Sequence, residues 1–261
     1  MSDAIYYGAH SLTIGDKHTW RDWHLIPVER PEFADAEPKF TYIEVPGSDG
    51  ELDASEALAG RLLFNMREGQ FQFYVDNDHE PWVQLYGRIK RYLQGRNLKA
   101  VLDDDPMWYY EGRFWCTEAT QDGIHMKITI NYKVKAYKYK LYTSIEDVPW
   151  DPLTLDDVVP LYLTKDIQLE GETIVELPAR AVGRAAVIPR FIVEIGADNP
   201  DGSIDLELTN PELKISRARS LAAGSTTDPG FILSGQNDDN VCTLKFSGNG
   251  KVSIEYRSGE L

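Results

Sequence analysis

Histidines are the residues of this chain with the most versatile chemistry, because imidazole can exchange protons or bind metal ions near neutral pH. The sequence has five: His10, His18, His24, His79 and His125. The first three lie close together, and strand residues at even spacing face the same side, so a metal-binding pair is one interpretation. No H-E-x-x-H motif accompanies them. Ordinary surface or half-buried histidines are the favoured interpretation.

Acidic residues give two further patterns that resemble metal sites. Asp103, Asp104 and Asp105 precede Pro106 and concentrate negative charge that could attract calcium. One triplet supplies too few ligands, and an Asp-Pro turn between strands accounts for it equally well. Residues 197–208 partly match a calcium loop but lack its first and last ligands. We therefore predict no metal site.

Motifs for catalysis and for cofactors are missing from the sequence. It contains no P-loop, no dinucleotide fingerprint and no G-x-S-x-G nucleophile turn. We predict no catalytic, cofactor-binding or metal-binding residues, and we expect that the chain is not an enzyme.

Aromatic side chains could stack against sugars, and several cluster in the first half of the chain. On strands, however, Trp and Tyr more often fill a core or a subunit interface. The second half from residue 160 has no tryptophan, and its other aromatic residues are few. Its composition is therefore a poor match to a sugar-binding groove.

Composition excludes further classes of partner. The formal net charge is −15 over 261 residues, whereas nucleic acids and anionic membranes attract clustered Lys and Arg. No run approaches the roughly 20 apolar residues of a membrane span, and the N-terminus does not resemble a signal peptide. Cys116 and Cys242 are widely separated, so we expect buried thiols and folding in a reducing cytoplasm.

The elements of the first half are predicted to be strands and one helix. Residues 81–93 place apolar side chains at spacings of three and four, and Gly95 follows as a stop, with Asp78 as a candidate cap. Residues 124–137 alternate between apolar and polar, which indicates a long strand whose edge could pair with a neighbouring subunit. The residues Arg67-Glu68-Gly69 are expected to form a short hairpin loop.

The second half is predicted to contain about eight short strands and no helix. Turn signals break it at regular intervals, including Asn249-Gly250, which favours a tight hairpin. This pattern indicates a β-sandwich of jelly-roll or galectin type. The proline-rich and acidic residues 146–160 are expected to be a linker, with Trp150 packed against one domain. The predicted domains are therefore residues 1–145 and 161–261.

Several segments together resemble the distal tail proteins of siphophages. One is the strand 23–26, and another is the run 42–53, which includes Val45-Pro46-Gly47-Ser48-Asp49-Gly50. The acidic turn 103–106, the strand 109–114 with Gly112-Arg113, and the C-terminal residues 254–261 also match the pattern of that family. The resemblance spans essentially the whole chain.

The resemblance implies a mainly β fold, in which an N-terminal β-barrel-like domain with one helix forms a ring and a C-terminal galectin-like domain projects outwards. It implies a structural protein of the virion tail tip, made and assembled in the host bacterial cytoplasm. The expected assembly is a homo-oligomer, a hexamer in that family, which joins the tail tube protein to the tail-tip hub protein and holds receptor-binding proteins. No cofactor and no nucleic-acid or membrane recognition are implied.

The candidate interface residues follow from the same resemblance. The loop 46–53 is our hypothesis for an arm that reaches an adjacent subunit, and a solvent-exposed hairpin loop is the alternative. The proposed contact residues are Pro46, Gly47, Asp49, Gly50, Asp53, Tyr110 and Arg113. Two other functions stay open: a carbohydrate-binding attachment module, and the equivalent baseplate component of a phage-derived contractile particle.

Overall fold

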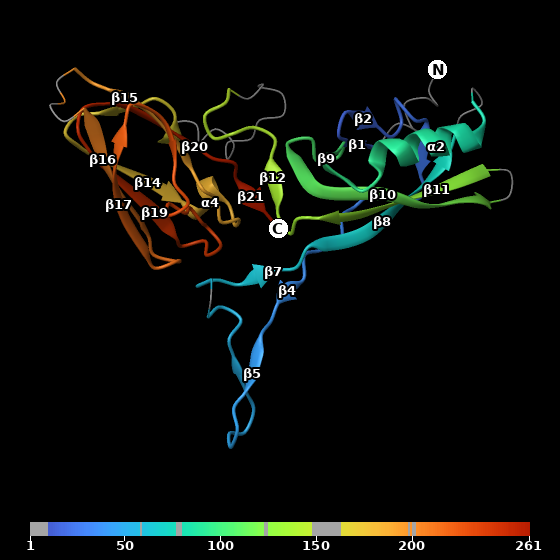
Figure 1. Cartoon of the computed structure of the whole chain (residues 1–261), viewed down its shortest axis with the longest axis horizontal. Helices are drawn as coiled ribbons and strands as arrows, with labels where there is room; N and C mark the ends of the chain where they lie inside the picture. The colour runs from blue at the N-terminus through green and yellow to red at the C-terminus, as the bar shows by residue number, and fades with distance from the viewer. Residues whose placement is uncertain are drawn as a thin grey trace. The chain divides into compact units, whose positions relative to one another are not determined.

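The computed structural model describes residues 10–57, 59–76, 80–122, 125–147, 163–197, 199 and 202–261. As predicted, the fold is mainly β (Figure 1). The chain divides into two compact units, residues 1–38 with 64–138 and residues 39–63 with 139–261. The linker expected at 146–160 lies largely outside the described residues, as do Trp150 and Asp78.

The first unit is built on one antiparallel sheet in the order β2-β1-β9-β10-β11-β8-β3. Its strands are β1 (Leu12–Ile14), β2 (Lys17–His18), β3 (Leu25–Pro27), β8 (Arg67–Val75), β9 (Arg96–Leu102), β10 (Trp108–Asp122) and β11 (His125–Val134). The alternation on β11 places Ile128, Ile130 and Tyr132 on the core side.

Helix α2 (Trp82–Leu93) covers the apolar face of this sheet, as Figure 1 shows. The predicted spacing is confirmed, since Leu85, Ile89 and Leu93 are fully buried. The helix ends at Leu93, as predicted: Gln94 adopts the left-handed conformation, and Gly95, the expected stop signal, follows at φ +69°. No side chain within the described residues caps the start at Pro81.

Two predictions for the first unit were wrong. Strand β11 is not an edge, because it pairs with β10 on one side and β8 on the other along nearly its whole length. Residues 67–69 are not a hairpin loop; they begin β8, and Arg67 is buried. Both errors have the same cause, since the sequence near these segments does not reveal which distant strands lie beside them.

The second unit packs two four-stranded sheets around one core. One sheet has the order β13-β20-β15-β18 and the other has the order β14-β19-β16-β17. The strands are β13 (Ile167–Leu169), β14 (Glu172–Pro178), β15 (Arg190–Ile195), β16 (Ser203–Asn210), β17 (Ile215–Ala222), β18 (Gly224–Thr227), β19 (Val241–Ser247) and β20 (Gly250–Glu255). β12 (Lys138–Lys140) pairs with β21 (Gly259–Glu260).

Details of the second unit differ from expectation. A single helical turn, α4 (Ala179–Val182), is present where no helix was predicted. The strand expected at 230–233 is reduced to one bridge between Leu233 and Val187. Strand β17 extends to Ala222, beyond the predicted end at 216. The prediction stopped too early because the Arg and Ser side chains of this segment show no alternation of apolar and polar residues. The residues before Gly250 link β19 to β20, but these strands belong to different sheets, so the tight hairpin predicted at Asn249-Gly250 was wrong.

Residues 38–64 add two small ladders. β4 (Pro38–Lys39) pairs with β7 (Leu63–Phe64), and β5 (Tyr42–Glu44) pairs with β6 (Glu51–Asp53). None of the helices in the described part of the chain is long and apolar enough to cross a membrane.

Candidate interaction surfaces

Residues 41–55 form a hairpin, here called the hairpin arm, that contains most of the predicted interface residues. The Ala54 amide donates to the Thr41 carbonyl at 2.8 Å, and the Thr41 amide donates to Ser55 Oγ at 2.9 Å. Every residue from 41 to 53 is exposed. Within the described residues β5 and β6 pair only with each other (Figure 1). Such an isolated two-stranded ribbon is marginally stable alone.

One face of the hairpin arm is apolar. Ile43 lies directly opposite Leu52, and their side chains are 49% and 58% exposed. Val45 is on the same face by alternation and is also exposed. Burying an apolar side chain of this size contributes about 1.5–3 kcal/mol, so this face is a favourable contact surface.

The other face of the hairpin arm is acidic. Glu44 lies directly opposite Glu51, and Asp53 lies opposite Tyr42. Like charges that are directly opposed on paired strands destabilise the pair. Hydrogen bonding to Ser55 holds the pKa of Asp53 below its usual value. The acidic face is therefore a charged surface without a cation from its own hairpin.

The tip of the hairpin arm contains Pro46, Gly47, Asp49 and Gly50. The Ser48 amide donates to the Val45 carbonyl at 3.1 Å and closes the turn. Gly47 and Gly50 have φ values of +82° and +92°, which other residues adopt only with strain. These glycines are explained by the turn itself, since an added Cβ at either would meet no atom within 4 Å.

Tyr110 and Arg113 lie on β10 of the first unit. Tyr110 is buried against Phe33, with ring centroids 4.0 Å apart, and burial raises its pKa. Its ring therefore packs the core and presents little surface to a partner. Arg113 is exposed and donates to the carbonyl of Gly95 at 2.8 Å.

The acidic turn at 103–105 makes a set of hydrogen bonds and ion pairs that were not predicted from the sequence. Asp103 Oδ2 lies 3.0 Å from His18 Nε2, and Asp104 lies 2.8 Å from His10 Nδ1. Asp105 accepts from Lys138 Nζ at 2.6 Å. No other signal in the sequence marks these partners, which come from distant segments. The turn ties strands together, and no group of three metal-ligating side chains occurs among the described residues.

Asp104 also binds a cation, Arg30, whose Nε is 2.9 Å away. Partial burial raises the pKa of Asp104, but the hydrogen bonds from His10 and Arg30 outweigh it and hold the pKa below its usual value.

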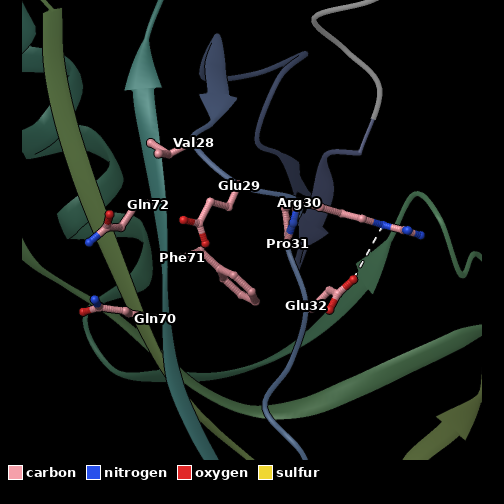
Figure 2. A pocket seen from close by; sticks show the side chains of 8 residues that line it. All are labelled: Val28, Glu29, Arg30, Pro31, Glu32, Gln70, Phe71 and Gln72. Atoms are coloured by element: carbon pink, nitrogen blue, oxygen red, sulfur yellow. Dashed lines mark ion pairs between the residues drawn. The ribbon is translucent and has the colours of Figure 1, made fainter.

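A polar cavity of about 340 Å³ lies beside β8, where β3 ends at Pro27 and the chain leaves the edge of the sheet. The Val28 amide donates to the Gln72 carbonyl at 2.9 Å, and the following residues diverge. Figure 2 shows Glu29 and Phe71 in this space, whereas Arg30 turns away toward Glu32. None of the eight lining residues is a histidine, serine or cysteine, so the cavity has no nucleophile with an oriented base.

A second hollow lies on the sheet that contains β16, β17 and β19. It is lined by Asp205, Leu206, Glu207, Ala218, Arg219, Ser220, Lys245 and Ser247. Its polar groups could bond sugar hydroxyls, but none of these described residues supplies an aromatic ring for stacking.

Comparison with known proteins adds one informative likeness. No family model matches the chain, and no curated protein matches it. A solved structure with a similar fold is that of SPP1 Dit (gp 19.1), described as a paradigm of the hub adsorption apparatus in phages that infect Gram-positive bacteria. The TM-score is 0.57 at 15% identity, over 96% of this chain and 99% of that chain. The two proteins share a fold along nearly their full lengths.

Proposed function

We propose that this chain is a structural protein of a phage tail tip, of the distal tail protein type. In this role copies of the chain close into a ring, hexameric in the expected family, that joins the tail tube to the tail-tip hub and anchors host-attachment proteins. The likeness in fold to SPP1 Dit supports the proposal, because it extends over both units. The segments 42–53 and 109–114 support it independently.

The observation that carries the proposal is the apolar face of the hairpin arm. Ile43 and Leu52 are about half exposed on a ribbon that has no third strand within the described residues. Insertion of this face into a contact between copies would remove both side chains from water and contribute about 3 kcal/mol per contact. In a ring each copy both gives and receives one such head-to-tail contact.

Light scattering and negative-stain imaging of the full chain test the proposal. We expect particles whose mass is a multiple of 29.6 kDa and whose outline is a ring. The double variant Ile43→Ser with Leu52→Ser should raise the concentration for half-assembly at least ten-fold and leave the melting temperature unchanged.

The matched control is Ile174→Ser with Ile188→Ser, since these isoleucines are 56% and 48% exposed in the second unit. The control should assemble as the parent does. A parent chain that stays monomeric at the highest soluble concentration would contradict the proposed function.

A further inference from the structure

Helix α2 and strand β9 carry a concentration of positive charge in a chain of net charge −15. Residues 81–102 contain five basic side chains and no acidic one: Arg88, Lys90, Arg91, Arg96 and Lys99. Arg88 pairs with Glu80, and Arg96 lies over the ring of Tyr92. Among the described residues no carboxylate pairs with Lys90 or Arg91.

The exposed face of α2 has two further unusual residues. Val83 is 81% exposed, and Gly87 lies one turn along the same face. An added Cβ at Gly87 would meet no atom within 4 Å. Glycine in a helix interior costs stability relative to alanine and allows close approach of a partner. Charge, an exposed apolar side chain and a glycine thus coincide on one helical face.

The hairpin arm has the complementary chemistry. Residues 41–55 contain four acidic side chains and no basic one. Glu44 and Glu51 are directly opposed, and Asp53 extends the same face. A cation inserted between the opposed carboxylates would convert their repulsion into attraction. The acidic face also includes Tyr42, which is 54% exposed.

We infer that the acidic face of the hairpin arm docks on the exposed face of α2 in a second copy of the chain. Lys90 and Arg91 bind Glu44, Glu51 and Asp53, and Tyr42 packs on Val83 beside Gly87. The lengths agree, since the helical face from Val83 to Arg91 spans about 12 Å and each three-residue strand of the hairpin arm spans about 10 Å. The inference rests on the proposed function and adds a second contact between copies, made by the opposite face of the hairpin arm.

Because the hairpin arm and α2 are different surfaces of the same chain, this contact can repeat head-to-tail and close a ring. It leaves the apolar face of the hairpin arm, with Ile43 and Leu52, turned away from α2. That face is free to pack elsewhere in the assembly. The two faces therefore make separate contributions, and variants can address them separately.

Charge reversal in the full chain tests the docking. Lys90→Glu with Arg91→Glu should raise the concentration for half-assembly at least ten-fold in light scattering, and so should Glu44→Lys with Glu51→Lys. The quadruple variant, which restores opposite charges, should return to within about three-fold of the parent. Lys214→Glu with Arg217→Glu, an equal charge change on exposed residues of the second unit, is the control and should assemble normally.

Cross-linking gives a second readout that separates one copy from another. Chains with Val83→Cys are mixed with differently sized chains that carry Asp53→Cys, and a short bis-maleimide is added. The native thiols Cys116 and Cys242 are buried. We expect a cross-linked heterodimer, and none when both cysteines are placed on the α2 face of separate chains.

The outcomes distinguish the docking from the proposed function. A parent that assembles, with reversal variants that assemble equally well and no cross-link, would refute the docking and leave the ring. A parent that is monomeric and does not cross-link would overturn both.

Discussion

His18 Nε2 lies 3.0 Å from Asp103 Oδ2, and 85 residues of chain separate the two. The other ring nitrogen, Nδ1, accepts from the amides of Trp20 and Arg21 at 3.2 and 3.0 Å. Because Nδ1 accepts from these amides, Nε2 is the nitrogen that donates to Asp103, and the ring satisfies every group that it contacts. The histidine therefore organises the turn after β2 and ties it to the acidic turn after β9.

Replacement of His18 by leucine should lower the free energy of unfolding by about 2–3 kcal/mol, because two backbone amides and Asp103 lose their partner. His10→Leu is the control: His10 is 53% exposed and should cost less than about 1 kcal/mol. Urea denaturation at neutral pH measures both. Equal losses in the two variants would show that the hydrogen bonds of His18 contribute no more to the free energy of unfolding than the exposed contact of His10.

For the acidic turn, the sequence predicted the turn itself but not the residues that bind it. The residue types at 103–105 indicated a turn, and the strands on either side were predictable from alternation. The partners His10, His18 and Lys138 were not, because polar contacts across a sheet depend on the strand order β2-β1-β9-β10. Helix α2, in contrast, follows from spacing within a single segment, so its buried face was predicted correctly.

Arg67 is a buried cation whose role can be tested. Its Nε donates to the Ala136 carbonyl at 2.7 Å and its Nη1 to the Ala34 carbonyl at 3.0 Å, while the guanidinium lies over Tyr110. Arg67→Met should lower the free energy of unfolding by about 2–4 kcal/mol, since it leaves two carbonyls without donors.

Arg67→Lys should recover little of that loss, because an ammonium cannot reach two carbonyls in the fork geometry of a guanidinium. Arg91→Met is the exposed control and should change the free energy of unfolding by less than about 0.5 kcal/mol. Chemical denaturation of the three variants is the measurement. If the Arg67→Lys variant were as stable as the parent, charge alone would suffice at this position.

The expectation of a loop at 67–69 failed for a related physical reason. Arg, Glu and Gly in sequence resemble turn chemistry, whereas here the arginine is buried by contacts from residues 34 and 136, far away in the chain. The sequence of β11 likewise does not reveal its two neighbours in the sheet, β10 and β8. The interface residues at 46–53 were located on an exposed hairpin arm, although their contacts with a partner remain a proposal.

Stability should fall in alkaline solution, partly because of Cys116. Burial raises the pKa of this thiol to about 12, from an ordinary value of 9.0. A raised pKa in the folded state means that the stabilising contribution is complete below about pH 9 and is lost as pH rises toward 12. The slope of unfolding free energy against pH between these values should therefore be less steep in Cys116→Ala than in the parent.

The difference in slope has an upper limit of about 1.4 kcal/mol per pH unit for a single group. The tyrosines whose pKa values burial raises are common to both proteins, so subtraction removes their effect. Urea titrations at several pH values give the two curves. Parallel curves would show that the Cys116 thiol is not protected by burial.

Two glycines should respond to alanine in opposite directions. At Gly112 a Cβ would collide with the Lys133 carbonyl and the Val134 Cα on the neighbouring strand, and central strands cannot move apart cheaply. Gly112→Ala should lower the free energy of unfolding by at least about 2 kcal/mol. At Gly87 the Cβ meets nothing, so Gly87→Ala should raise it by about 0.5–1 kcal/mol through helix propensity. Thermal and urea denaturation measure both variants. If both changed the free energy of unfolding in the same direction, close packing against the neighbouring strand would not explain the glycine at residue 112.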